Sequence, residues 1–412
     1  MQHNISLLSI ALLLCSTASG SSISELQEWL KQEPLNDGRM AALSKQSFAK
    51  AALTKQEASQ ASALIWNSRA EALRQERKAE MDSRVIRIGD KKMPFWFRTF
   101  GKKPADGRRL FISMHGGGGA PPAVNDQQYE NQKRLYQPEE GIYLVPRAPT
   151  DTWNLWHQGH IDAFFDRIIT NMVIFHDVNP DRVYIMGYSA GGDGVYQLAP
   201  RMADRLAAAA MMAGHPNETK PDGLRNIGFT LHMGARDAAY RRNQIAAEWK
   251  EKLAALQKSD PEGYQHHVEI HPGRAHWMNL EDRVAVPWMS RFSRQRFPKR
   301  IVWLQDDVTH SRFYWLRTGQ TGGRPRVVAE RKGNKISIPE SDVRQLTILL
   351  HDDFIDIDSP VQVVSGDKVL FDGSVERTVA AIAESIGERD EPGAAVYASV
   401  SVELPTSNNA AK

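Results

Sequence analysis

The stretch VYIMGYSAGGDGVYQL, Val183–Leu198, constrains the fold of this chain more than any other. Its apolar and β-branched residues up to Met186 predict a buried strand, and the residues from Val195 onward predict a helix. Between them, the pattern Gly-x-Ser-x-Gly centred on Ser189 is typical of a sharp strand-to-helix turn that strains the serine backbone. Glycine flanks such a turn because it has no Cβ atom. The stretch therefore predicts an α/β fold with the Ser189 hydroxyl lifted out of the sheet.

A serine hydroxyl becomes a nucleophile only when an imidazole takes its proton and a carboxylate orients that imidazole. In this type of fold the chain order is serine, then an acidic residue, then histidine. Asp237 follows the strand-like run 227–233, and His276 follows a second such run and a Pro-Gly turn. Because open α/β sheets gather their active sites at the carboxyl ends of strands, we expect Ser189, Asp237 and His276 to meet.

Other residues near these positions offer alternatives. Asp193 lies one turn into the predicted helix, where an acidic residue stabilises the helix N-terminus. His266, His267 and His271 fall in or before the last predicted strand, so we interpret each as a structural histidine. The plainest alternative is that Ser189 is only a turn residue in a loop rich in glycine and serine.

A run of four glycines, Gly116–Gly119, follows the strand-like residues Leu110–Met114 and His115. Glycines let the backbone approach a ligand closely, so we expect the N–H of Gly116 or Gly117, together with that of Ala190, to form an oxyanion hole. A phosphate loop is disfavoured because no Gly-Lys-Ser/Thr follows. A flexible linker is disfavoured because the run directly follows a buried strand. We interpret His115 as a structural residue that orients the glycine loop.

The motifs HGGGG and GYSAGG, followed by Asp237 and His276 in that order, resemble the α/β-hydrolase superfamily. The similarity is to the branch with poly(3-hydroxybutyrate) depolymerase-like and feruloyl esterase-like enzymes, phospholipase/carboxylesterase-type proteins and prolyl-oligopeptidase-like peptidases, and it spans roughly residues 84–298. It implies a doubly wound, mostly parallel sheet and no cofactor or metal. It also implies that Ser189 is the nucleophile, His276 the general base and acid, and Asp237 the orienting carboxylate.

These implications favour a serine hydrolase that cleaves carboxylic esters, small or polymeric, through an acyl-enzyme. One alternative is a serine peptidase acting on small peptides, and another is a binding protein that keeps the fold without turnover. No propeller-like pattern precedes the hydrolase segment, which disfavours an oligopeptidase, and no member of the triad is missing, which disfavours the binding protein. Trp153, Trp156 and Tyr188 are candidates for the substrate groove, although tryptophan is equally typical of packed rims.

The N-terminal residues 1–20 have the pattern of a signal peptide. An apolar core, Ile5–Leu14, is too short to span a bilayer and is followed by small residues, with cleavage expected near Ala18 or Gly20. This predicts a secreted or periplasmic protein without a stable membrane span. Cys15 is the single cysteine, so the mature chain would contain no disulfide. With 52 Lys and Arg against 49 Asp and Glu, the formal charge of +3 argues against a nucleic-acid or anionic-membrane partner.

The length of 412 residues with 41% hydrophobic content predicts more than one unit. Residues 21–83 read as a helical segment, with Thr54 and Glu57 as a capping box before a long helix. Residues 84–300 read as the catalytic domain, beginning with two strands joined by a turn at Gly89–Lys92. Residues 312–405 read as a small all-β accessory domain, whose role is packing, dimerisation or binding of a polymer, with packing preferred. No sequence pattern specifies the oligomeric state.

Overall fold

The computed structural model describes residues 22–320 and 322–405. The predicted signal peptide at 1–20 lies outside the described residues. The first described elements are helices: α1 (Ser22–Leu30), α2 (Asp37–Leu43) and α3 (Lys55–Ser83). The predicted capping box at the start of α3 is confirmed, since Glu57 N–H donates to Thr54 Oγ1 and Thr54 N–H donates to Glu57 Oε2. None of the described helices is both long and apolar enough to cross a lipid bilayer.

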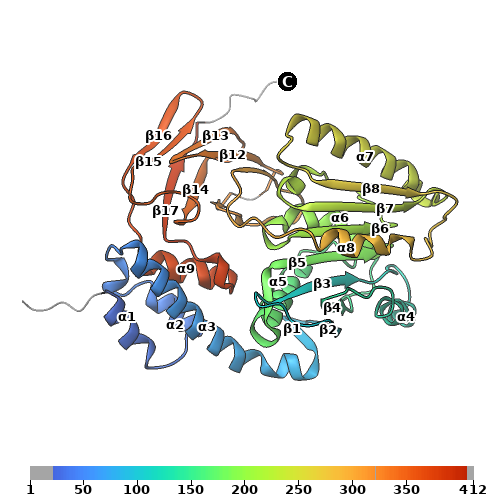
Figure 1. The fold of residues 1–412 in the computed structure, drawn as a ribbon, viewed down its shortest axis with the longest axis horizontal. Helices are drawn as coiled ribbons and strands as arrows, with labels where there is room; N and C mark the ends of the chain where they lie inside the picture. The colour runs from blue at the N-terminus through green and yellow to red at the C-terminus, as the bar shows by residue number, and fades with distance from the viewer. Residues whose placement is uncertain (1–21, 321, 406–412) are drawn as a thin grey trace, which may run out of the picture.

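An eight-stranded, mostly parallel sheet forms the centre of the molecule (Figure 1). Its strand order is β1-β2-β4-β3-β5-β6-β7-β8. The first two strands are antiparallel as predicted, and the strands from β4 to β8 in this order run parallel. The strands are β1 (Val85–Ile88), β2 (Lys91–Phe100), β3 (Arg108–Met114), β4 (Gly141–Pro146), β5 (Val178–Tyr188), β6 (Ala208–Met212), β7 (Gly228–Gly234) and β8 (His266–His271).

Helices cover both faces of this sheet. Alternate residues of each strand point to opposite sides, so both faces present apolar side chains that the helices bury. On β5, Ile185 packs into the core shared with α5 (His160–His176), α6 (Ala190–Arg201) and α7 (Arg242–Ser259). Its neighbours Tyr184 and Met186 pack on the other face with the short α8 (Ala285–Met289). A further helix, α4 (Pro122–Gln132), follows the glycine run. The doubly wound arrangement predicted from the sequence is confirmed.

The C-terminal part of the chain is rich in β-strands, in two sheets. One has the order β16-β15-β13-β12-β9 and the other β10-β11-β14-β17. The strands are β9 (Arg300–Leu304), β10 (Arg312–Phe313), β11 (Leu316–Arg317), β12 (Arg326–Lys332), β13 (Lys335–Ser341), β14 (Gln345–Leu350), β15 (Val361–Ser365), β16 (Lys368–Gly373) and β17 (Ala398–Glu403).

Two features of this part differ from the sequence prediction. The β-rich part begins before residue 312, because β9 pairs with β12. It is also not all-β, because it contains the helix α9 (Val379–Arg389), which is capped by Thr378. This helix was overlooked in the sequence because it lies between two strand-like runs. Its apolar residues recur at helical spacing: Val379, Ile382, Ala383 and Ile386.

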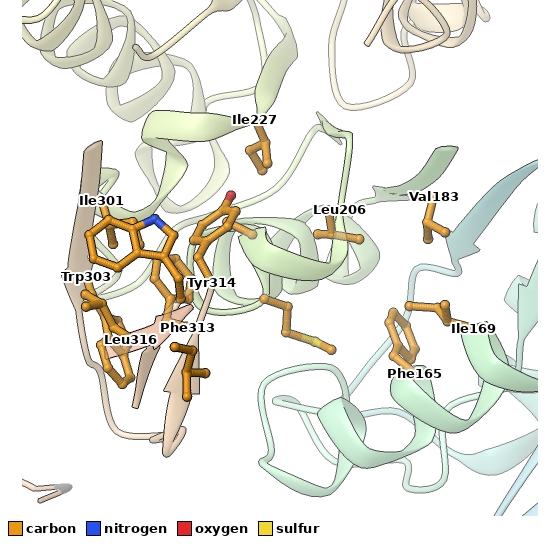
Figure 2. Close-up of a cluster of buried hydrophobic side chains, with 14 of the residues drawn as sticks. Phe165, Ile169, Val183, Leu206, Ile227, Ile301, Trp303, Phe313, Tyr314 and Leu316 are labelled. Atoms are coloured by element: carbon orange, nitrogen blue, oxygen red, sulfur yellow. The ribbon is translucent and has the colours of Figure 1, made fainter. Parts of the chain in front are cut away.

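The eight-stranded sheet and the helices that cover it, from β1 to α8, form what we call the central unit. The N-terminal helices and the C-terminal sheets pack on this unit through one continuous apolar core. Figure 1 shows α3 and α9 side by side, and the two helices are in contact. Figure 2 shows buried side chains from both parts lying close together: Phe165, Ile169, Val183, Leu206 and Ile227 from the central unit, and Ile301, Trp303, Phe313, Tyr314 and Leu316 from the C-terminal part. The three parts of the chain therefore share their packing.

Candidate active site

The turn after β5 holds Ser189 in a strained backbone conformation, with φ 58° and ψ −120°. The turn is so tight that a Cβ atom at Gly187 would lie 2.2 Å from the carbonyl oxygen of Gly191. The Ser189 N–H donates to the carbonyl oxygen of Met212 on β6 at 3.0 Å. This geometry places the serine side chain at the carboxyl edge of the sheet, in front of the first turn of α6.

His276 and Asp237 lie beside Ser189. His276 Nε2 is 3.0 Å from Ser189 Oγ, and His276 Nδ1 is 2.6 Å from Asp237 Oδ2. The Asp237 side chain, in the loop after β7, is only 2% exposed, whereas that of His276 is 44% exposed. A carboxylate can only accept, so Nδ1 carries the imidazole proton and Nε2 is free to accept the serine proton. The structure thus brings together the three residues that the sequence order singled out.

The alternative acidic residue, Asp193, makes a different contact. Its Oδ1 accepts a hydrogen bond from the backbone N–H of His215 at 2.6 Å. Burial raises the pKa of Asp193 to about 6. Asp193 therefore supports the loop after β6, while Asp237 is the carboxylate in contact with His276.

Backbone N–H groups border the space beside Ser189 Oγ. The glycine loop passes so close that a Cβ atom at Gly116 would lie 3.3 Å from Ser189 Cβ, and Gly117 has φ +103°. Within the described part of the chain, no hydrogen-bond acceptor faces the N–H of Gly116 or Gly117. The N–H of Ala190 belongs to the first turn of α6, where backbone donors have no partner inside the helix. These groups can stabilise negative charge on a bound oxygen atom.

His115 fixes the start of the glycine loop from the protein interior. The backbone N–H of Ala148 donates to His115 Nε2 at 3.1 Å, so Nδ1 carries the proton and donates to the carbonyl oxygen of Gly116 at 2.6 Å. Burial lowers the pKa of His115 to about 4, which keeps the ring neutral. These contacts fit the interpretation that His115 orients the loop.

Asn125 on α4 holds the next part of the loop and was missed in the sequence. Its Oδ1 accepts from Gly118 N–H at 2.9 Å, and its Nδ2 donates to Asp151 Oδ1 at 2.8 Å. Arg147 Nη2 donates to the same Asp151 oxygen at 2.5 Å. Asparagine is a poor helix former, so its position inside a helix just after the glycine run is the signal that points to it.

A cleft of about 660 Å³ opens in front of Ser189. Its apolar wall includes Tyr188, the half-exposed Trp277, Val124 and Leu135, and its polar lining includes Gln128, Asn131 and Arg134. The Tyr188 hydroxyl donates to the carbonyl oxygen of His276 at 2.6 Å and accepts from the N–H of Met278 at 3.0 Å. Tyr188 therefore both lines the cleft and holds the loop that carries His276.

The two tryptophans proposed for the groove occupy other positions. Trp156 is fully buried, and its Nε1 donates to the carbonyl oxygen of His115 at 2.9 Å, so its assignment to the groove was wrong. Trp153 is 64% exposed but packs beside Gly119, outside the cleft. Tyr188, the third candidate, does line the cleft, together with Trp277, which follows His276 in the chain and was overlooked in the sequence.

Comparisons with known proteins point to hydrolases of the esterase type. Residues 145–288, which include Ser189, Asp237 and His276, match the model of the Dienelactone hydrolase family. The strand order and the strained serine turn are those of the α/β-hydrolase fold. The chain is also 33% identical over 112 residues to the bifunctional acetylxylan esterase/xylanase XynS20E of Neocallimastix patriciarum. That alignment covers 26% of this chain and 16% of the relative, so the chain spans only a small part of its length.

Solved structures with a similar fold include a thermostable esterase. It shares 14% identity, with 51% of this chain and 62% of that chain covered and a TM-score of 0.38. Another is poly(aspartic acid) hydrolase-1 from Sphingomonas sp. KT-1, with 15% identity, 50% and 96% covered and a TM-score of 0.37.

Proposed function

We propose that this protein is a serine hydrolase that cleaves carboxylic esters through an acyl-enzyme on Ser189. The observation that carries the proposal is the continuous hydrogen-bonded path from Ser189 Oγ through His276 to Asp237, at 3.0 Å and 2.6 Å. The strained turn and the unpaired N–H groups of the glycine loop support the same chemistry.

In the first half of the reaction, Ser189 Oγ attacks the ester carbonyl carbon while its proton passes to His276 Nε2. The imidazolium that forms is stabilised by the Asp237 carboxylate. The second oxygen of this carboxylate, Oδ1, lies 3.9 Å from Nη1 of the Arg242 guanidinium group, whose positive charge helps to hold it in place. The carbonyl oxygen becomes an oxyanion, and the N–H groups of Ala190 and of Gly116 or Gly117 are the donors beside it. The tetrahedral intermediate then releases the alcohol, which takes the proton from His276.

In the second half, water replaces the alcohol. His276 Nε2 removes a proton from the water as it attacks the acyl carbon, and then returns that proton to Ser189 Oγ as the acid leaves. The half-exposed position of the His276 side chain leaves room for this water. The cycle therefore needs no group beyond the residues of this chain.

The cleft favours an ester with an apolar or aromatic portion. The rings of Tyr188 and Trp277 lie 5.6 Å apart beside Ser189, and Val124 and Leu135 continue the apolar wall. A cleft of about 660 Å³ accommodates a group much larger than acetyl. The name of the partly matching acetylxylan esterase supports an ester substrate, without specifying the acyl group of this protein.

Steady-state kinetics with a matched pair of substrates tests the proposal. We expect p-nitrophenyl esters to be hydrolysed and the corresponding p-nitroanilides to be hydrolysed far more slowly, with Ser189→Ala losing at least ~10³-fold in kcat. Ser290→Ala on α8 is the control, because its hydroxyl only donates to a carbonyl oxygen of the same helix and should leave both rates unchanged. Preferential hydrolysis of anilides would favour the peptidase, and undiminished ester turnover by Ser189→Ala would contradict the mechanism.

A further inference from the structure

A second cluster of titratable side chains lies at the edge of the central sheet, away from Ser189. It consists of His232 on β7 and His267, Glu269 and His271 on β8, and we call it the edge cluster. β8 is the last strand of the sheet (Figure 1). His267, Glu269 and His271 occupy every second position along it, so their side chains share one face. His232 is the register partner of Glu269 and points to the same face, which α8 borders through a contact between Trp288 and His267.

The nitrogen and oxygen atoms of the edge cluster converge. His232 Nδ1 lies 3.2 Å from His271 Nε2 and 3.9 Å from Glu269 Oε2, and His267 Nε2 lies 3.6 Å from that same oxygen. One ligand atom each of His232, Glu269 and His271 lies within 4.8 Å of the other two. In a tetrahedral zinc site with bonds of about 2.0–2.1 Å, neighbouring ligand atoms are about 3.3 Å apart. The distance between His232 Nδ1 and His271 Nε2 already matches this spacing, and the Glu269 carboxylate would need to approach the two nitrogens more closely.

Further side chains orient the two buried rings from outside the cluster. Thr230 Oγ1 lies 2.9 Å from His232 Nε2, and Glu281 Oε2 lies 3.4 Å from His271 Nδ1. Metal-bound histidines are held in this way, with the second ring nitrogen facing a hydroxyl, carbonyl or carboxylate.

Without a cation, the two buried imidazoles pair with each other, whereas the Glu269 carboxylate, which is 44% exposed, is left to solvent. A single proton between His232 Nδ1 and His271 Nε2 completes one hydrogen bond. The Glu269 carboxylate faces three imidazoles at 3.6–3.9 Å, beyond hydrogen-bond range, and among the described residues it makes no hydrogen bond at all. A cation between these groups would give the carboxylate and the imidazole lone pairs a common partner.

We propose that the edge cluster binds one divalent transition-metal ion, with Zn²⁺ as the best fit to its nitrogen and oxygen donors. The ligands are His232 Nδ1, His271 Nε2 and a Glu269 oxygen, and the half-exposed His267 supplies a fourth through Nε2. On binding, each neutral ring carries its single proton on the nitrogen that faces away from the metal, His232 Nε2 toward Thr230 and His271 Nδ1 toward Glu281, so both ligating nitrogens offer lone pairs. The site is structural: His271 begins the loop that carries His276, and the ion would anchor that loop to β7.

Zinc binding to the mature full-length protein tests this inference without reference to activity. After treatment with a chelator, competition with a chromogenic zinc indicator should show one Zn²⁺ per chain with a submicromolar dissociation constant, and zinc should raise the Tm. Co²⁺ should produce the visible absorption of a four-coordinate site. Failure to bind zinc at micromolar concentration would overturn the proposal.

Substitutions locate the ion. Glu269→Gln and His267→Gln change partly exposed side chains, so both should fold, and each should weaken zinc binding by at least ~10-fold. His232→Gln should abolish it. His266→Gln is the control, because His266 lies on the same strand with its Nδ1 2.8 Å from the carbonyl oxygen of Tyr264, and it should bind as the unmodified protein does. If Glu269→Gln and His267→Gln both retain zinc with unchanged affinity, the ion lies elsewhere and the assignment is overturned. The same holds if covalent labelling of Ser189 displaces the zinc.

Discussion

At the residue scale, the chemistry of the candidate site depends on backbone N–H groups that distant side chains hold in place. Gly116 is fixed through His115 and Gly118 through Asn125. Gly117, between them, has a backbone conformation that favours glycine, and a Cβ atom there would lie 2.2 Å from Asn125 Oδ1. The position of the loop therefore depends on Asn125 as much as on the glycines themselves.

Replacing Asn125 by leucine keeps the branching at Cγ but removes the acceptor for Gly118 N–H. We expect kcat for ester hydrolysis to fall by about 10-fold, roughly 1.4 kcal/mol of transition-state stabilisation, because the oxyanion donors lose their fixed position. Gln127→Leu, on the exposed side of the same helix, should change kcat little. An unchanged kcat in folded Asn125→Leu would show that the loop keeps its position without this contact.

The buried Asp193 predicts a pH-dependent contribution to stability. Its folded-state pKa of about 6 lies above the ordinary value of 3.8 because burial disfavours the charged form. Its contribution to stability is therefore complete below the ordinary pKa and is lost as the pH rises through the folded-state pKa. Asp193→Asn has no such pH-dependent loss. The unfolding free energy of the variant minus that of the parent protein should therefore rise by about 1–3 kcal/mol between about pH 4 and about pH 7. Urea unfolding at both pH values measures the difference, and an equal difference at both would contradict the prediction.

At the scale of single elements, α3 shows how local sequence sets a boundary. The predicted capping box closes on Thr54, and Ala61, Ile65 and Ala72 are buried along the helix. Thr54→Ala should lower the unfolding free energy by about 1 kcal/mol, because Glu57 N–H loses its acceptor. Thr54→Ser, which keeps the hydroxyl, should stay within a few tenths of the parent value. Equal losses in both variants would mean that the threonine methyl group, not the cap, is what matters.

The elements that sequence predicts well are those with a local physical cause. The serine turn, the glycine run after β3 and the two antiparallel strands at the start of the sheet each follow from residues that adjoin in the chain. The loops of Asp237 and His276 follow from the rule that parallel strands end at one edge. Trp156 was misplaced because residue type does not say whether an indole faces the core or the solvent.

The edge cluster shows what local patterns omit. His267 and His271 were interpreted one by one as structural histidines, since nothing in the chain places His232 beside them. The cross-strand register of β7 and β8 creates that neighbourhood, and register comes from tertiary packing. Asn125 was missed because its side chain joins two segments, the glycine loop at Gly118 and Ala120 and the separate loop at Asp151.

At the scale of the whole molecule, a buried charge network joins the C-terminal part to the central unit. The Glu391 carboxylate accepts from Arg205, next to β6, and from Arg294, in the segment before β9. Burial alone would raise the pKa of Glu391, but the two guanidinium groups reverse this effect and lower it to about 2. The carboxylate is thus charged and fully enclosed.

Glu391→Gln should destabilise the whole chain by about 3 kcal/mol, because it removes the buried charge that Arg205 and Arg294 share and leaves each with one carboxylate, Asp166 and Asp181. The loss should appear in a single cooperative transition, since the parts share one apolar core. Glu384→Gln on α9 provides the control, because its ion pair with Arg317 is largely exposed and should contribute little. Thermal unfolding that splits into two transitions, with only the C-terminal part affected, would contradict this account.

The central claim is that Ser189 is the nucleophile of this α/β hydrolase. The most direct measurement is to react the mature protein with a fluorophosphonate and to locate the adduct by mass spectrometry of its peptides. We predict one adduct per chain, on Ser189, with ester turnover lost in proportion to labelling and with no adduct on Ser189→Ala. Labelling on another residue, or turnover that persists in the fully labelled protein, would contradict the claim.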